Sequence, residues 1–131
     1  MINRNDEASM KRTALNNRED EYSGFLDTNG FLIDPVLWHA HLANRMAWRL
    51  GVGDLAVAHW RVIERLRTGW LAEGNLPLQR HICRELALGS GCVDKLFGGL
   101  VEAWKVAGLP DPGEEARVYM ENMEPDDTIT G

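Results

Sequence analysis

Apolar residues in the central part of the chain recur every three or four positions, the spacing that places them on one face of an α-helix. The clearest stripe consists of Trp38, Leu42, Met46 and Leu50. Glycine and proline interrupt this pattern and divide it into about five short segments. We expect helices over residues 35–50, 55–73, 77–88, 92–97 and 100–107. Asp34 and Asp54 are the expected N-caps of the first two.

Residues 22–33 have a different pattern. Asn29-Gly30 offers the two residues with positive φ that a type I′ turn requires, and apolar residues flank it on both sides. Because an isolated hairpin is only marginally stable, it must pack on the helices. The expected fold class is therefore α+β but mostly α, with an N-terminal β-hairpin packed on a bundle of about five short helices.

Two prolines and two glycines fall within residues 107–113, so a helix cannot continue there. We expect Leu109, Pro110 and Pro112 to form an arm that leaves the body. The composition then divides the chain into a flexible leader (1–21), a helical domain (22–112) and an acidic, largely disordered tail (113–131) with at most a transient helix over 115–123.

The charge of the chain is unevenly distributed. The formal net charge is −6, yet residues 35–84 hold seven arginines against three acidic residues, and residues 113–131 hold six acidic residues against one arginine. The body is therefore mildly basic and the tail acidic. No apolar run approaches the roughly 18 residues that span a bilayer, and the leader has no apolar signal region. We expect a cytoplasmic protein with no membrane contact.

The chain contains two cysteines, Cys83 and Cys92. This number is typical of a reducing compartment and predicts no disulfide framework. Cysteine is often buried, so inert core thiols are the favoured interpretation. The alternative is a reactive thiol, because Arg80 and Arg84 flank Cys83 and would favour its thiolate form.

No set of residues predicts an enzyme. His39 and His41 stand two positions apart and would point to different sides of a helix, which disfavours a shared metal ion. His59 precedes Trp60 on a predicted packed helix, so a semi-buried histidine with satisfied hydrogen bonds is favoured over a metal ligand. His81 has no carboxylate or nucleophile at a spacing that would indicate catalysis, and phosphate-binding and dinucleotide motifs are absent from the sequence. We expect no catalysis, no metal, no cofactor and no small-molecule substrate.

The segments 55–73 and 77–88 have the spacing of a helix-turn-helix unit, joined through Gly74-Asn75-Leu76. The second of them would expose Gln79, Arg80, His81 and Arg84 to DNA. Helix pairs with such turns are also common packing units, and an acidic tail repels phosphates. Binding to nucleic acid is therefore disfavoured but stays an alternative.

Several segments, taken in order and with their spacing kept, resemble one family. They are Asp-Thr-Asn-Gly-Phe-Leu-Ile-Asp-Pro-Val-Leu-Trp at 27–38, His-Trp-Arg-Val-Ile at 59–63, Leu-Arg at 66–67, Pro-Leu-Gln-Arg at 77–80, Leu-Phe at 96–97 and Ala-Gly-Leu-Pro-Asp-Pro at 107–112. The chain is similar here to the DsrC/TusE family of sulfur-relay proteins, also called gamma subunits of dissimilatory sulfite reductase. The resemblance implies a helical body with an N-terminal hairpin, a cytoplasmic location and protein partners.

The resemblance also implies a mobile C-terminal arm that holds a persulfide on a cysteine, with a second cysteine earlier in some members. In this sequence those two positions fall on Glu115 and Trp104, and neither side chain can hold a persulfide. We therefore predict a non-carrier or regulatory relative that docks to sulfurtransferase or sulfite-reductase components. The predicted docking residues are Arg67, Arg80, Arg84, Leu109, Pro110 and Pro112. The alternatives are a sulfur carrier that uses Cys83 or Cys92 and a helix-turn-helix regulator of sulfur genes.

Overall fold

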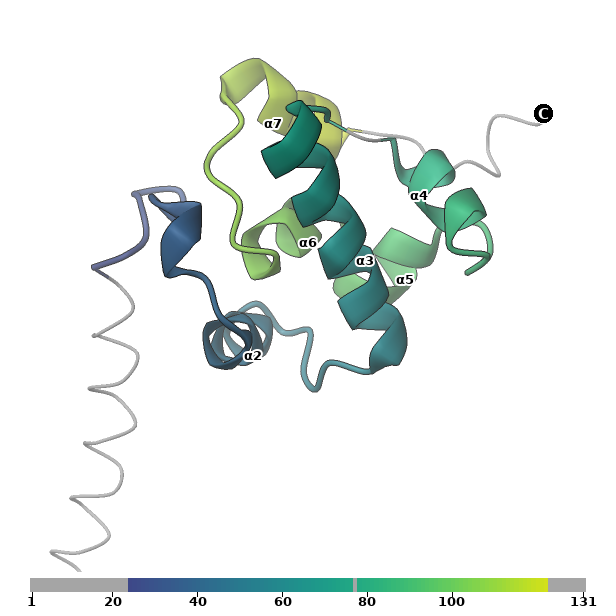
Figure 1. Cartoon of the computed structure of the whole chain (residues 1–131), viewed down its shortest axis with the longest axis horizontal. Coiled ribbons are helices and arrows are strands. Elements are labelled where there is room, and N and C mark those ends of the chain that lie inside the picture. Colours follow the sequence, from purple (N-terminus) through teal and green to yellow (C-terminus); the bar gives the residue numbers. More distant parts are fainter. Residues whose placement is uncertain (1–23, 77, 123–131) are drawn as a thin grey trace, which may run out of the picture.

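The computed structural model describes residues 24–76 and 78–122, and this part of the chain is helical (Figure 1). The elements in order are the 3₁₀-helix η1 (Pro35–Leu37), α2 (Ala40–Arg49), α3 (Val57–Arg67), the π-helix η2 (Thr68–Ala72), α4 (Gln79–Glu85), α5 (Cys92–Phe97), α6 (Leu100–Val106) and α7 (Glu114–Glu121). The five predicted helical segments of the body are thus present as α2 to α6. The predicted leader, residues 1–21, lies outside the described residues.

The predicted N-terminal β-hairpin is wrong, because the described residues contain no β-strand. A single antiparallel bridge pairs Leu26 with Leu32. Between them the Asp27 carboxylate accepts the backbone N–H of Asn29 at 2.8 Å and of Phe31 at 3.0 Å. Asp27 thereby organises a wider loop in which Gly30 has a positive φ of 89° and Asn29 does not. A type I′ turn needs positive φ at both residues, so the described part of the chain is all-α.

Two helices begin later than the sequence predicts. Asp34 caps only the short turn η1, through the N–H of Val36, and Trp38 is extended. α2 begins at Ala40 instead, where His39 Nδ1 accepts the N–H of Leu42. Asp54 is likewise not the cap of α3. At the start of α3, the Nδ1 of His59 accepts the backbone N–H of Ala56. At both helix starts, a histidine side chain therefore supplies the hydrogen-bond acceptor that we predicted for an aspartate.

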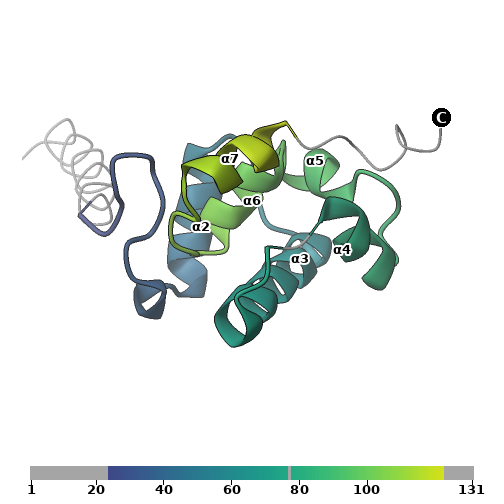
Figure 2. The same ribbon diagram turned by 90° about the horizontal axis from the view of Figure 1, so that it is seen from above.

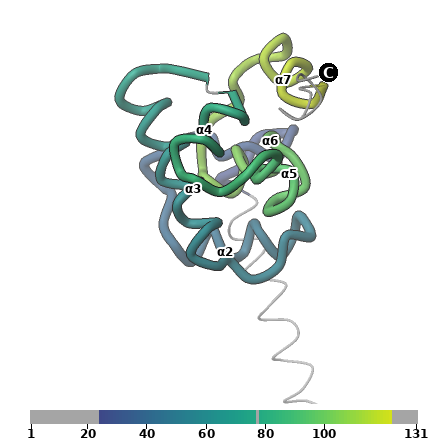
Figure 3. The backbone as a smooth tube through the Cα atoms, turned by 90° about the vertical axis from the view of Figure 1, so that its right-hand side faces the viewer, coloured from purple at the N-terminus to yellow at the C-terminus, as the bar shows by residue number. Residues whose placement is uncertain are grey.

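The core is centred on α6, which packs against α2, α3, α5 and α7. Figures 1 and 3 show α6 between α2 and α7, and Figure 2 shows the same body from above. Trp104 on α6 is completely buried and is the largest of the fully buried side chains. None of the helices in the described ranges is long and apolar enough to cross a membrane.

α7 occupies part of the segment that we expected to be largely disordered. Residues 114–121 are helical, and Met120 is buried against the core while its neighbours remain exposed. α7 packs against α6. A single apolar anchor in an acidic stretch is a weak sequence signal, which explains why composition alone suggested disorder. Residues 123–131 of the predicted tail lie outside the described residues.

Candidate functional site

Arg67, one of the predicted docking residues, is engaged within the body. Its Nη1 donates a hydrogen bond to the carbonyl oxygen of Ala107 at 2.8 Å. The guanidinium carbon lies 4.1 Å from the centre of the Trp38 ring, a cation–π contact. Burial lowers the pKa of Arg67. This side chain joins α3, the segment before α2 and the end of α6, so the donors that we assigned to a partner are occupied internally.

Arg80 and Arg84 are placed differently, on the outward face of α4. They are one helical turn apart, with His81 beside them, and Arg84 and His81 are exposed. Among the residues that the structure describes, neither guanidinium has a hydrogen bond or an ion pair. Two cations without a counter-charge on one short helix are available to a partner.

A cleft of about 500 Å³ lies beside this face. Its lining residues come from the end of α3, the connection before α4 and α4 itself: Arg65, Asn75, Leu76, Leu78, His81, Arg84 and Glu85. Arg65 and Glu85 form an ion pair at 3.1 Å and neutralise each other. The cleft therefore combines two leucines with the unpaired charge of Arg84.

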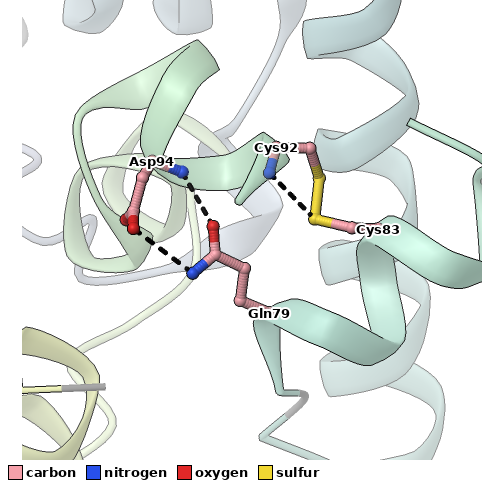
Figure 4. Close-up of a disulfide and its surroundings, with 4 residues drawn as sticks. All are labelled: Gln79, Cys83, Cys92 and Asp94. Atoms are coloured by element: carbon pink, nitrogen blue, oxygen red, sulfur yellow. Dashed lines mark hydrogen bonds between the residues drawn. A yellow bond between two sulfur atoms is a disulfide. The ribbon is translucent and has the colours of Figure 1, made fainter. Parts of the chain in front are cut away.

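The inward face of α4 carries a disulfide between Cys83 and Cys92 (Figure 4). Both residues are buried, at 2% and 3% exposure, and the described part of the chain has no free cysteine. The prediction of two unpaired thiols is thus wrong. The chain reverses between α4 and α5 through three residues with positive φ (Ala87, Gly89 and Gly91), which brings the two Cα atoms to 5.7 Å.

Gln79 is a second link between α4 and α5, although its sequence context predicted an exposed, DNA-facing side chain. Its side chain accepts the backbone N–H of Asp94 at 2.9 Å, near the start of α5 (Figure 4). The residue is only 2% exposed, so it does not face solvent as a DNA-reading residue would. α5 has no capping side chain of its own. The helix-turn-helix prediction loses one of its four DNA-facing residues.

The predicted arm after α6 lies against the body rather than leaving it. Leu109 is completely buried, and Trp104 Nε1 donates to the carbonyl oxygen of Pro110 at 2.8 Å. Gly108 has a φ of 70°, and a Cβ atom there would overlap the ring of Trp38. Only glycine fits this close approach. Of the three predicted docking residues here, only Pro110 and Pro112 are partly exposed.

Asp111 fastens the next part of the arm. Its Oδ1 accepts hydrogen bonds from Arg117 Nε at 3.0 Å and from the N–H of Gly113 at 2.9 Å, and Asn29 donates to Oδ2 at 3.3 Å. Burial raises the pKa of Asp111, but these hydrogen bonds and the charge of Arg117 outweigh it and lower the pKa overall. The start of α7 and the loop at Asn29 are therefore tied to the same carboxylate.

The two positions that correspond to cysteines in the resemblance lie in different surroundings. Trp104 is buried, and its ring meets that of Trp70 edge-to-face with centroids 5.3 Å apart. Glu115 is exposed in the first turn of α7. Neither position offers a nucleophilic sulfur.

The histidine pair is closer than we predicted. The rings of His39 and His41 stack with centroids 6.2 Å apart, because His39 lies outside α2 and the helical spacing does not apply to it. Within residues 24–76 and 78–122, no group of three or more potential ligands gathers around a common point that would suit a metal ion.

Comparisons with known proteins agree with the resemblance. Residues 19–114 match the family described as "DsrC like protein". A protein named Sulfurtransferase TusE from Sodalis glossinidius (strain morsitans) is 33% identical over 95 residues, which cover 66% of this chain and 87% of that protein. Proteins of the same name from Salmonella choleraesuis (strain SC-B67) and Pectobacterium atrosepticum are 30% identical over 95 residues, which cover 66% of this chain and 86% of each relative.

Proposed function

Since this chain belongs to the DsrC/TusE family of sulfur-relay proteins, we propose that it acts in a sulfur relay as a docking protein that carries no sulfur itself. The proposal includes a cytoplasmic location and the absence of an enzymatic activity of its own. Its partners would be sulfurtransferase- or sulfite-reductase-type proteins. The curated relatives bear the name sulfurtransferase, so the non-carrier role is the part that separates this chain from them.

The observation that carries the proposal is the chemistry of the arm. A relay carrier needs a thiolate on a segment that can enter a partner's pocket. Here the two relevant positions hold Trp104 and Glu115, and Leu109 is buried. The arm thus has neither a reactive sulfur nor an unattached backbone at its start. These features favour a fixed surface over a swinging carrier.

The surface that suits docking is the outward face of α4 with the adjoining cleft. Arg80 and Arg84 present guanidinium groups without counter-charges, and Leu76 and Leu78 supply apolar lining. Arginine is enriched at interfaces because its planar group pairs with carboxylates while its stem packs. We expect the partner to present a segment that combines carboxylates with an apolar side chain.

The two alternatives receive less support. A carrier that uses Cys83 or Cys92 would need a free thiolate, and both sulfurs are buried in a disulfide. A DNA-binding role would need Gln79 at the surface, whereas Gln79 binds the start of α5. Mass spectrometry after incubation with a persulfide donor tests the first alternative, since an added sulfur atom on the intact chain would contradict the non-carrier role.

Docking is tested by affinity purification of the tagged full chain from its native host. We expect the chain to recover a sulfurtransferase or sulfite-reductase component, and the variant Arg80→Ala/Arg84→Ala to lose it. Arg49→Ala is the matched control, because Arg49 is an exposed arginine on α2. Recovery of neither class of component by the unaltered chain would contradict the proposal, as would equal recovery by the double variant.

A further inference from the structure

The two faces of α4 have opposite characters. α4 has seven residues, of which Gln79, Ile82 and Cys83 are buried, while Arg80, His81 and Arg84 face outward. A helix of this length is not stable alone in water, so its order depends on its contacts. α5 is the helix against which α4 chiefly packs. The orientation of the outward cations is therefore set by how α4 is held to α5.

Two polar attachments and one covalent bond hold this pair together. Gln79 binds the backbone of Asp94, and the N–H of Cys92 donates to Cys83 Sγ at 3.2 Å. The disulfide joins the same two helices across a separation of nine residues (Figure 4). Between them, Ala87 adopts a φ of 57°, which is unfavourable for a residue with a Cβ atom. A bond that closes this loop restricts the chain to the conformation that places α4 on α5.

We propose that the Cys83–Cys92 disulfide is a redox switch that keeps the outward face of α4 ordered for docking. The inference rests on the proposed docking function, because it concerns the same face. Cys83 lies on the same turn of α4 as Arg80 and immediately precedes Arg84. Breaking the disulfide therefore releases the part of α4 that carries these two cations. α4 contributes only Ile82 and Cys83 to the buried apolar core, whereas α2, α3 and α6 contribute most of it, including Trp104. Reduction thus loosens one face and leaves the body folded.

The step requires a dithiol reductant. Because Cys92 is only 3% exposed, the attack takes place during a local opening of α4. One thiolate of the reductant then attacks Cys92 Sγ, the bond to Cys83 Sγ breaks, and a mixed disulfide forms. Cys83 is the leaving sulfur because it already accepts the N–H of Cys92, which stabilises the departing thiolate. The second thiol of the reductant then displaces Cys92. Two electrons pass to the protein, the dithiol becomes a disulfide, and its two protons complete the thiols of Cys83 and Cys92.

Amide hydrogen exchange of the full chain with and without dithiothreitol tests the switch. We expect reduction to raise exchange in residues 79–91 by at least about tenfold, with little change in α6. The variant Cys83→Ser/Cys92→Ser should exchange like the reduced chain in both conditions, with no further response to dithiothreitol. Equal exchange in α4 before and after reduction of the unaltered chain would overturn the switch, whatever the variant does.

The same two redox states are then used to capture a sulfurtransferase or sulfite-reductase component from the native host. We expect the oxidised chain to recover several-fold more of it than the reduced chain. Equal recovery in both states, together with faster exchange after reduction, would overturn the control of docking while the docking function itself would stand. Recovery in neither state would contradict the proposed function, and hydrogen exchange would still decide whether the bond orders α4.

Discussion

The arm after α6 and the outward face of α4 both carry polar side chains on a helical body, but they differ in how those side chains are used. Asp111 and Arg117 of the arm pair with each other, and Arg67 of α3 donates to the carbonyl oxygen of Ala107 at the start of the arm. On α4, within the described residues, Arg80 and Arg84 have no such partner. Residue type and surface position therefore do not distinguish an arginine that stabilises the fold from one that is available to a partner, whereas the contacts of the guanidinium group do.

The largest effect is expected at Trp104, the buried side chain of α6 to which the arm is attached. Trp104→Ala should lower the free energy of unfolding by about 3–5 kcal/mol, because a fully buried indole leaves a cavity and the carbonyl of Pro110 loses its donor. Urea denaturation measures the change. Trp48→Ala is the matched control, since Trp48 is 65% exposed and should cost less than about 1 kcal/mol. Similar losses in the two variants would contradict the central place of Trp104.

A second test concerns the close approach of the arm to the body. Gly108→Ala should lower the free energy of unfolding by about 2–4 kcal/mol, because the new Cβ atom overlaps the Trp38 ring and φ is positive. Gly51→Ala is the matched control, because Gly51 has a similar φ of 82° and nothing lies near the Cβ atom that would be added. It should cost only about 1 kcal/mol. Thermal unfolding of both variants separates the cost of the clash from the cost of the positive φ. Equal decreases in the melting temperature would show that the arm moves away from Trp38 at no measurable cost.

Much of the helical pattern could be predicted from the sequence, because glycine positions and apolar spacing are local signals. The stripe of Leu42 and Met46 on α2 is buried as expected. The hairpin failed because a single carboxylate, that of Asp27, reorganised the turn at Asn29. Competition between side-chain and backbone hydrogen bonds cannot be read from residue type alone.

The candidate site was less accessible to sequence reasoning, since it depends on contacts between distant residues. Arg67 and Arg84 both lie in segments predicted to be helical, and only the fold places Arg67 next to Trp38, 4.1 Å from the ring centre. The pairing of Cys83 with Cys92 likewise depends on the reversal of the chain at Ala87. The nine-residue spacing with Gly89 and Gly91 near its end was the one available signal, and it does not fix a pairing by itself.

The third test compares the two kinds of arginine directly. Arg67→Lys should lower the free energy of unfolding by about 1–2 kcal/mol, because lysine cannot reproduce both the hydrogen bond to Ala107 and the stacked contact with Trp38. Arg84→Lys should change stability by less than about 0.5 kcal/mol, since its guanidinium has no partner among the described residues. Urea denaturation measures the free energy of unfolding of both variants. Equal losses would mean that the contacts of Arg67 with Ala107 and Trp38 do not stabilise the fold.

The smallest expected effect is a pH dependence of the free energy of unfolding, which arises from Asp111 in the arm. The pKa of Asp111 is lowered in the folded chain, so its ionised form stabilises the fold above the unfolded pKa near 3.8, and this contribution is lost as the pH falls through the folded pKa. The group is close to solvent, which limits the effect to less than about 1 kcal/mol. Asp111→Asn should therefore be less stable than the unaltered chain at pH 6, and this gap should close in acid. Asp54→Asn, which removes an exposed carboxylate without a partner among the described residues, controls for the loss of one negative charge. A gap for Asp111→Asn that stays constant from pH 6 into acid would show that the carboxylate charge does not hold the arm, and that its other contacts, including those of Leu109 and Trp104, do so.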